Sequence, residues 1–363
     1  MADSPKISDR KADHLALCAE QDVEARRKTT LLEEVELLHD SLPELDVESI
    51  DLGVEVLGKS LAAPLLITGM TGGADEAQEI NRVLAQIAEE LGIAFGVGSQ
   101  RAMLDHKDLK KSYQVRDVAP TILLFGNIGA VQAANLSTAK ARDLVGAIEA
   151  DALCIHLNPG QELIQPEGDR DFRGCLEAIT RLHDELDVPV IVKETGCGLS
   201  PRTLDKIRST GVDWVDTSGA GGTTWIGVES MRTDEAPQKT LGALFWDWGI
   251  PTAPSIVYAR ERDFSVIASG GLRDGLDAAR AIALGANLCG MALPWLRAAH
   301  EGGLDGARAF GASTLSALRT ACLLTGSSTI EELRDTPKVL GPKLERWLGK
   351  YTAVKGRKPG IGF

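Results

Sequence analysis

Eight short apolar segments recur along the chain, and segments with a helical spacing of apolar residues separate most of them. The apolar segments are residues 64–69, 93–97, 121–125, 153–157, 188–192, 212–215, 264–268 and 288–292. The helical patterns between them include residues 74–91, 136–148, 172–186, 201–209 and 275–284. Strands that alternate with helices indicate parallel βαβ units, and eight such units close most naturally into a (β/α)8 TIM barrel. The competing architecture is an open doubly wound sheet, but no Gly-x-Gly-x-x-Gly pattern follows the first segment.

The remaining segments predict additions to this barrel. Residues 1–60 predict an N-terminal arm and cap, with a short hairpin or plug near 54–59, residues 61–335 the barrel, and residues 336–363 a C-terminal tail. A helical extension begins near Trp295. The first 30 residues are polar, and an unanchored terminus of this kind is normally a solvated arm. Residues 223–241 are long enough for a lid or a wall of the site.

The stretch from Cys154 to Asp169 contains the densest chemistry. Its apolar beginning predicts a buried strand, and Pro159 ends that strand near Asn158. A histidine, amides and a carboxylate follow at once, at the end of the strand where barrels carry their active sites. The alternative is a satisfied turn that caps a helix. Similar polar clusters at other strand ends favour a functional site.

Glycines follow the sixth and seventh predicted strands, at Gly219, Gly221, Gly222, Gly270 and Gly271, and Gly290 lies in the eighth. Glycine loops at these places let backbone N–H groups approach a phosphate, and Ser218 and Thr223 could add hydroxyl donors. The alternative is a set of tight turns that need glycine for a positive φ. Three neighbouring loops favour a phosphate-bearing cofactor.

Lys193 ends the fifth strand, where its cation could stabilise negative charge at N1 and O2 of a flavin. A Schiff-base lysine is the alternative. Donors from the first three strand ends could line the flavin edge: Thr68, Gly69, Met70, Thr71, Ser99 and Asn127.

Several motifs together resemble type 2 isopentenyl-diphosphate isomerase, the FMN-dependent kind, over nearly the whole chain. The longest is His156-Leu157-Asn158-Pro159-x-Gln161-Glu162 with Gln165-Pro166-Glu167-Gly168-Asp169, which is highly specific. The others are Arg10-Lys11-x-x-His14, Met70-Thr71-Gly72-Gly73, Gly98-Ser99-Gln100-Arg101, Lys193-Glu194-x-Gly196-x-Gly198, Ser218-Gly219-Ala220-Gly221-Gly222-Thr223-x-Trp225 and Ala268-Ser269-Gly270-Gly271.

The resemblance implies a (β/α)8 enzyme that interconverts isopentenyl and dimethylallyl diphosphate with FMN and Mg²⁺. NADPH would keep the flavin reduced. The arm would fold over the barrel mouth, and the substrate would be bound by Arg10, Lys11, Arg101, Asn158 and Gln161. Gln161 and His156 would be the catalytic side chains, and Glu162 would hold Mg²⁺. FMN would be bound by Thr68, Met70, Thr71, Ser99, Asn127, Lys193, Ser218, Thr223, Gly270, Gly271, Arg273, Met291 and Ala292.

The implied reaction adds a proton to an alkene carbon and removes one from a carbon two bonds away. A side-chain acid protonates an unactivated alkene poorly, because the product is a tertiary carbocation. Reduced flavin is therefore the expected main acid and base, with Gln161 orienting the allylic end. Two departures from the family pattern, Gly160 and Gly126, put substrate shape in doubt more than reaction type.

Composition and charge exclude other classes. With 363 residues, 44% hydrophobic and 25% charged, the chain can bury a large core. A net charge of −13 argues against nucleic-acid binding. Six cysteines without a Cys-x-x-Cys pair predict reduced thiols, buried at Cys154, Cys197 and Cys289. No apolar signal region or membrane-spanning segment is evident, so a cytoplasmic protein without stable membrane association is expected. The resemblance adds a homo-oligomer, tetramer or larger.

Two other functions remain open from the sequence. One is another FMN-dependent TIM-barrel oxidoreductase, such as a 2-hydroxyacid oxidase, which needs a catalytic histidine near the late strands. The histidines outside the arm and the central motif are predicted surface residues: His39, His106, His183 and His300. The other is a non-catalytic flavin-binding paralogue, which has no need of Glu162.

Overall fold

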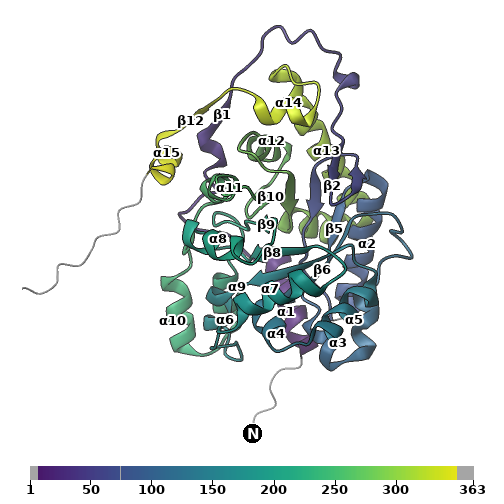
Figure 1. The fold of residues 1–363 in the computed structure, drawn as a ribbon, viewed down its shortest axis with the longest axis vertical. Helices are drawn as coiled ribbons and strands as arrows, with labels where there is room; N and C mark the ends of the chain where they lie inside the picture. The colour runs from purple at the N-terminus through teal and green to yellow at the C-terminus, as the bar shows by residue number, and fades with distance from the viewer. Residues whose placement is uncertain (1–6, 74, 350–363) are drawn as a thin grey trace, which may run out of the picture.

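The computed structural model describes residues 7–73 and 75–349; the side chains of residues 7–10, 75, 105, 107 and 108 lie outside what it describes. Its centre is a closed parallel barrel of eight strands, as the apolar pattern predicts (Figure 1). Neighbours around the barrel follow chain order, and β11 pairs with β4 to close it. The strands are β4 (Leu65–Ile67), β5 (Ala94–Gly96), β6 (Leu124–Gly129), β7 (Ala152–Leu157), β8 (Val190–Glu194), β9 (Trp214–Asp216), β10 (Ser265–Ser269) and β11 (Leu288–Met291).

Helices surround the barrel and connect its strands. They are α2 (Asp75–Leu91), α3 (Arg101–Asp105), α4 (Ala130–Ala134), α5 (Thr138–Ile148), α6 (Pro159–Ile164), α7 (Cys175–Glu185), α8 (Pro201–Arg208), α9 (Trp225–Arg232), α10 (Ala236–Leu244), α11 (Thr252–Arg260), α12 (Gly275–Ala283) and α13 (Leu293–Leu324). A short 3₁₀ helix, η3 (Lys107–Ser112), follows α3. The predicted segment 223–241 is therefore two short helices. Thr223 and Trp225 from its beginning line the pocket at the barrel mouth, so the segment forms a wall of the site.

Residues inside the barrel alternate along each strand, and this alternation creates an apolar floor beneath a polar layer. Leu66, Phe125, Cys154, Ile191, Ile267 and Leu288 belong to one buried cluster inside the barrel. Two residues further along those strands stand Thr68, Asn127, His156, Lys193, Ser269 and Gly290. Because successive strand residues point to opposite faces, a step of two keeps each side chain inside the barrel and one layer higher. The polar layer is therefore the floor of the mouth.

A hairpin plugs the opposite end of the barrel. Its strands are β2 (Val54–Val56) and β3 (Lys59–Leu61), which pair antiparallel. Val56 and Leu61 pack into the same cluster as the barrel floor. The predicted plug near 54–59 is thus confirmed.

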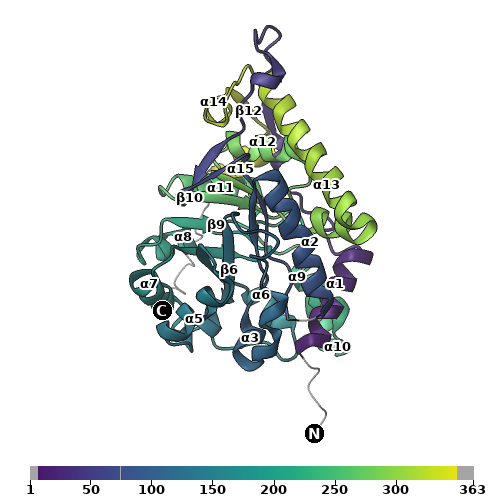
Figure 2. The ribbon, with the colours of Figure 1, turned by 90° about the vertical axis from the view of Figure 1, so that its right-hand side faces the viewer.

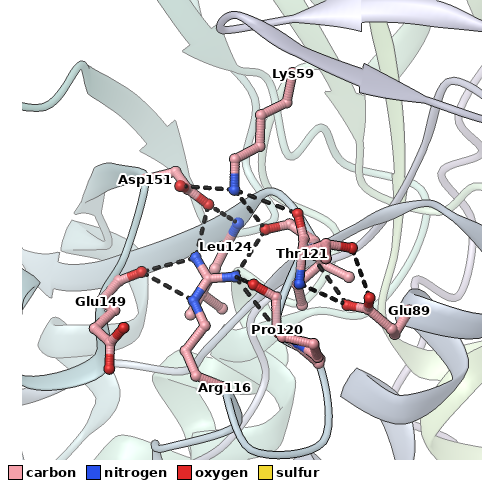
Figure 3. Close-up of polar contacts among 10 residues, drawn as sticks. Lys59, Glu89, Arg116, Pro120, Thr121, Leu124, Glu149 and Asp151 are labelled. Atoms are coloured by element: carbon pink, nitrogen blue, oxygen red, sulfur yellow. Dashed lines mark hydrogen bonds and ion pairs between the residues drawn. The ribbon is translucent and has the colours of Figure 1, made fainter.

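Ionic contacts fasten this plug to the barrel (Figure 3). Asp151 accepts contacts from Lys59 and Arg116, each at 2.8 Å, and a hydrogen bond from the N–H of Leu124 at 2.7 Å. Lys59 and Arg116 also bind the carbonyl of Ile122, at 3.0 and 2.9 Å. These contacts direct that carbonyl toward the plug, and β6 begins at Leu124. The predicted third strand, 121–125, started too early for this reason.

Asp151→Asn is expected to destabilise the protein by about 1–2 kcal/mol, because it weakens two partly buried ion pairs. Burial by itself would raise the pKa of Asp151, but hydrogen bonds from Lys59, Leu124 and Arg116 outweigh it and lower the pKa. The contribution is therefore present at neutral pH and is lost as the pH falls below about 4. Urea unfolding at pH 7 and at pH 3 measures both effects. A variant that is equally destabilised at both pH values contradicts the ionic role.

Segments from near the beginning and near the end of the described chain pair beside the barrel. Strand β1 (Val35–Leu37) pairs antiparallel with β12 (Lys338–Leu340), far from it in sequence (Figure 1). The 3₁₀ helices η1 (Leu32–Glu34) and η2 (Val47–Ser49) flank β1, and α14 (Ile330–Asp335) and α15 (Pro342–Leu348) flank β12. The first helix, α1 (Ile7–Glu20), packs against α2, α9 and α13 (Figure 2).

None of the helices in the described residues is both long enough and apolar enough to cross a membrane.

Candidate functional site

A pocket of about 1370 Å³, counting the part open to solvent, lies at the mouth of the barrel where the strands end. Most residues that the sequence predicts for the site line it: Lys11, Thr68, Met70, Thr71, Ser99, Arg101, Asn127, His156, Asn158, Gln161, Glu162, Lys193, Ser218, Thr223, Gly270, Gly271, Arg273 and Ala292. Met291 is buried in β11 instead, and its carbonyl accepts the N–H of Thr68 at 3.0 Å. The side chain of Arg10 lies outside the described part of the chain.

Helix α1 lies over this mouth. Lys11, His14, Leu15 and Cys18 line the pocket. Leu15 and Cys18 belong to a buried cluster with Val228 of α9 and with Leu293 and Leu296 of α13. An apolar contact of this kind anchors the segment, so the expectation of a solvated arm is wrong for the described side chains from Lys11 onward. The arm covers the barrel, as the resemblance implies.

His156 is a neutral hydrogen-bonding group in this pocket. Its Nδ1 lies 2.7 Å from Oδ1 of Asn127, an oxygen that can only accept, so Nδ1 carries the proton and Nε2 is left as an acceptor. Burial, followed by the positive charges of Lys11, Lys193 and Arg101, lowers the pKa of His156 to about 3. At neutral pH this side chain can orient a partner or accept a proton, but it cannot act as an imidazolium acid.

The lowered pKa predicts a loss of stability on acidification. Between about pH 6.5 and 3 the unfolded chain binds a proton at this histidine and the folded chain does not. Stability therefore falls with decreasing pH, by at most about 1.4 kcal/mol per pH unit from this group. Urea unfolding of the wild type and of His156→Asn from pH 7 to pH 5 tests it: we expect the stability difference between them to shrink as the pH falls. A constant difference contradicts the burial of a neutral histidine.

The central motif forms helix α6, which begins with Pro159 directly after the strand β7. Asn158 does not cap this helix with its side chain; its Nδ2 donates to Oε1 of Glu162 at 2.9 Å and approaches Oε1 of Gln161 at 3.4 Å. The other carboxylate oxygen of Glu162 accepts the N–H of Asp169 at 2.7 Å. The motif thus fixes an amide pair and a buried carboxylate beside the pocket.

Glu229 on α9 is a residue that the sequence prediction missed. Its Oε1 lies 2.9 Å from Nε2 of His14 and 3.2 Å from Nε2 of Gln161, and its Oε2 accepts from Arg232 at 2.8 Å. Burial alone would raise the pKa of Glu229, but the hydrogen bond and charge of His14, with Arg232, bring it down to about 2. The ionised carboxylate therefore connects the arm to Gln161 and fixes the direction of its amide.

Glu194 shapes the wall of the pocket from below. Its Oε2 accepts the backbone N–H groups of Thr195 at 2.6 Å and Gly198 at 3.0 Å, and also that of Cys197. Burial raises the pKa of Glu194 to about 7, although these hydrogen bonds oppose the shift. Glu194 therefore holds the loop after β8 in place. Thr195 and Gly196 of this loop line the pocket.

The residues on the late strands fit a phosphate-bearing flavin. Gly270 and Gly271 have φ angles of +97° and +84°, and a side chain at Gly270 would meet the backbone of Gly219. The positive φ angles show that these turns require glycine. Because both glycines lie in the pocket wall, their backbone can also contact a ligand.

After the first barrel strand, Thr71 Oγ1 is buried and has no hydrogen-bond partner among the described residues. A cofactor with polar edges would supply that partner.

The described residues contain no group of three or more His, Cys, Asp or Glu side chains that could hold a metal by themselves. Glu162 is thus not part of such a group in the described residues. Magnesium characteristically uses one or two carboxylates, several waters and substrate phosphates. The donor set therefore fits Mg²⁺ that arrives with a diphosphate and does not fit a closed protein site.

The departure at Gly160 has a structural explanation. A side chain there would come within 2.9 Å of Cδ1 of Ile226 on α9 and within 3.6 Å of Sγ of Cys197. Ile226 therefore fills the space that a larger residue would take, and the pocket is not loosened. Cys197 itself is half-buried, while Cys154 and Cys289 are buried as predicted.

Comparisons with known proteins identify a matching protein family and close sequence relatives. The family model described as FMN-dependent dehydrogenase matches residues 4–117 and 156–340. An isopentenyl-diphosphate delta-isomerase of Methanothermobacter thermautotrophicus is 46% identical over 346 residues, covering 95% of this chain and 96% of that protein. One from Halobacterium salinarum is 45% identical, covering 97% and 98%.

Solved structures agree with the fold. A mandelate oxidase variant with an FMN adduct superposes with a TM-score of 0.61 and 15% identity, over 90% of this chain and 95% of that one. At this identity the likeness concerns the barrel alone. The sequence relatives carry the assignment further, and the chain belongs to the FMN-dependent isopentenyl-diphosphate delta-isomerase family.

Proposed function

We propose that this protein interconverts isopentenyl diphosphate and dimethylallyl diphosphate, using FMN kept reduced by NADPH, and Mg²⁺. The observation that carries the proposal is the docking of α1 over the mouth. It brings Lys11 and His14 to the pocket that Arg101, Gln161 and Glu162 also line. A small diphosphate substrate would find cations, amides and one carboxylate there.

The diphosphate would be bound at the outer part of the pocket. Lys11 and Arg101 offer positive charge, and Arg10 precedes Lys11 on the same helix. Glu162 would hold Mg²⁺, which would supply positive charge for the diphosphate, and this role explains why a carboxylate stands among these cations. Leu15, Leu293 and Leu296 line the same pocket, and with α1 in place they would exclude water from the hydrocarbon end.

The polar residues at the mouth of the barrel would hold the cofactor and orient the substrate. Reduced FMN would supply the proton donor and acceptor and an electron-rich face that stabilises the tertiary cation. Lys193, Ser218 and the Gly270–Gly271 loop would hold its ring and phosphate. Gln161, fixed by Glu229, would place the allylic end, and neutral His156 would accept a hydrogen bond through Nε2.

A 2-hydroxyacid oxidase is the second candidate, since the family model and the barrel include such enzymes. Such an oxidase needs a catalytic histidine near the late strands. The histidines among the described lining residues are His14, from the arm, and His156, from β7. His39, His106 and His300 are exposed and His183 is half-buried in α7. The isomerase therefore fits the pocket better. Glu162 argues likewise against a non-catalytic paralogue.

An anaerobic assay tests the proposal. The protein is mixed with FMN, Mg²⁺ and isopentenyl diphosphate, with and without NADPH or dithionite, and dimethylallyl diphosphate is followed. We expect turnover with reduced FMN and almost none with oxidised FMN. A parallel assay follows oxygen consumption with mandelate and lactate. Bound FMN with oxidase activity and no isomerisation would overturn the proposal.

The homo-oligomer of four or more subunits and the cytoplasmic location stay predictions. Size-exclusion chromatography with light scattering measures the first of these.

A further inference from the structure

Lys193 reaches the pocket as one half of an ion pair. Its Nζ lies 2.7 Å from Oδ2 of Asp216 and 3.4 Å from Oγ of Ser269. Residues 193 and 216 stand opposite each other in the register of β8 and β9, so both side chains point into the barrel. The side chain of Asp216 is 2% exposed and that of Lys193 is 10% exposed. The pair is therefore screened from water and lies in the polar floor of the mouth.

Asp216 is held in place from other sides as well. Its Oδ1 accepts the N–H of Ser218 at 3.2 Å and the hydroxyl of Ser269 at 2.5 Å. Lys193, Ser218 and Ser269 line the pocket, whereas Asp216 is not among the described lining residues. Asp216 consequently acts on a ligand through its charge and through these neighbours, and not by direct contact.

Burying this ion pair between strands carries a large desolvation cost. Removing two charges from water costs several kcal/mol per ion, and apolar side chains of similar size often stabilise a core better. The charges thus call for a role beyond packing. A lone cation beside a flavin favours negative charge on the reduced ring, and a carboxylate next to that cation weakens the effect.

We propose that Asp216 is a positioning residue that partly neutralises Lys193 and thereby sets how strongly the site favours negatively charged, reduced FMN. This inference rests on the proposed function, because it requires FMN beside Lys193. It deepens that function in one respect. An isomerase must let its reduced cofactor give and regain a proton without giving up electrons. A cation whose charge is already balanced pulls less on the negative charge that remains when the proton leaves.

The test measures the reduction potential of bound FMN, by equilibration with a reference dye, in the full chain and in variants. Asp216→Asn is expected to raise the potential, equivalent to a rise of about tenfold or more in the ratio of the dissociation constants of oxidised and reduced FMN. Lys193→Met is expected to lower it. Ser269→Ala, which removes a hydrogen bond to Asp216 and no charge, should change the ratio by less than about threefold. Asp151→Asn removes a paired carboxylate at the far end of the barrel and serves as the matched control.

The spectrum of the photoreduced flavin gives a second readout. Asp216→Asn should shift it toward the anionic reduced form at a given pH. If Asp216→Asn fails to fold, Lys193→Met is compared with the double variant Lys193→Met/Asp216→Asn, and the double variant should have the higher potential. A purely structural role predicts altered melting temperatures without shifts of opposite sign in potential.

The outcomes separate the two proposals. Wild-type protein that does not bind FMN defeats the proposed function and this inference together. If the wild-type protein binds FMN but every folded variant without Asp216 has the same reduction potential as its matched partner, this inference alone is wrong.

Discussion

Glu229→Gln is expected to reduce kcat by about 100-fold and to destabilise the protein by about 2–4 kcal/mol. The carboxylate accepts from His14, Gln161 and Arg232 at once. A glutamine offers one oxygen and an N–H₂ group, so it satisfies fewer of these donors and leaves the arginine in a buried place with a weaker partner. Gln161 can then turn its amide over, and small misplacements of reacting groups typically cost about 100-fold.

Steady-state kinetics and urea unfolding measure these two effects. Glu167→Gln is the matched control, because Glu167 contacts the same Arg232 at the rim, with bonds of 2.9 and 3.1 Å, and its side chain is 32% exposed. The control should cost less than about 1 kcal/mol. A Glu229→Gln enzyme with the wild-type kcat would show that the direction of the Gln161 amide does not matter for turnover.

The same carboxylate predicts a pH dependence of stability. Because the pKa of Glu229 is lowered to about 2 in the folded protein, the unfolded chain takes up this proton first, near pH 4.3. Its stabilising contribution is complete above that value and is lost as the pH falls toward 2. Glu229→Gln should therefore lose less stability than the wild type between pH 5 and pH 3.

Glu162→Gln is expected to abolish the dependence of turnover on Mg²⁺ and to reduce kcat/KM by at least about 100-fold. The described residues offer no further cluster of metal ligands, so the metal loses its anchoring charge with this one side chain. FMN affinity should stay within about threefold of wild type, since the glycine loops lie on other strands. Fluorescence titration with FMN and a magnesium titration of the rate separate these effects. An unchanged magnesium profile would remove Glu162 from the metal site.

The arrangement of the site explains why the arm is part of it. Glu229 receives His14 from α1 and Gln161 from α6, and these two residues are more than 140 positions apart in the chain. The arm therefore brings more than Lys11 to the substrate. Its docking completes the hydrogen-bond set that holds Gln161 in place.

Much of the polar floor could be predicted from the chain, because it follows from a local rule. Strand residues alternate with a period of two, so Cys154 and Ile191 inside the barrel imply His156 and Lys193 one layer higher, at the mouth. The step from apolar to polar residues at each strand end marks the site without any knowledge of tertiary contacts. The sequence also placed Asn158, Gln161 and Glu162 together after the strand, although it did not predict that Gln161 and Glu162 lie on the short helix α6.

The partners of these residues could not be predicted in this way. Asp216 directly follows the predicted strand 212–215, and its pairing with Lys193 depends on the register of β8 and β9. Glu229 lies in the segment 223–241, which the sequence predicts only as a lid or a wall of the site, and the start of β6 depends on cations from the hairpin and from Arg116. A buried charge gives no periodic signal; its partner is chosen by the packing of segments far apart in sequence.

The sequence by itself determined the eight-unit barrel, the end of the barrel that carries the site and most of the side chains that line it, because hydrophobic period and turn chemistry act over a few residues. Only the tertiary structure decided which apolar side chains anchor α1 over the mouth, that β1 pairs with β12, and that His14, Asp216 and Glu229 fix the charges and amides of the site. Those choices arise from burial of apolar faces and from the need of each buried charge for a partner, and both depend on contacts that the order of residues does not show.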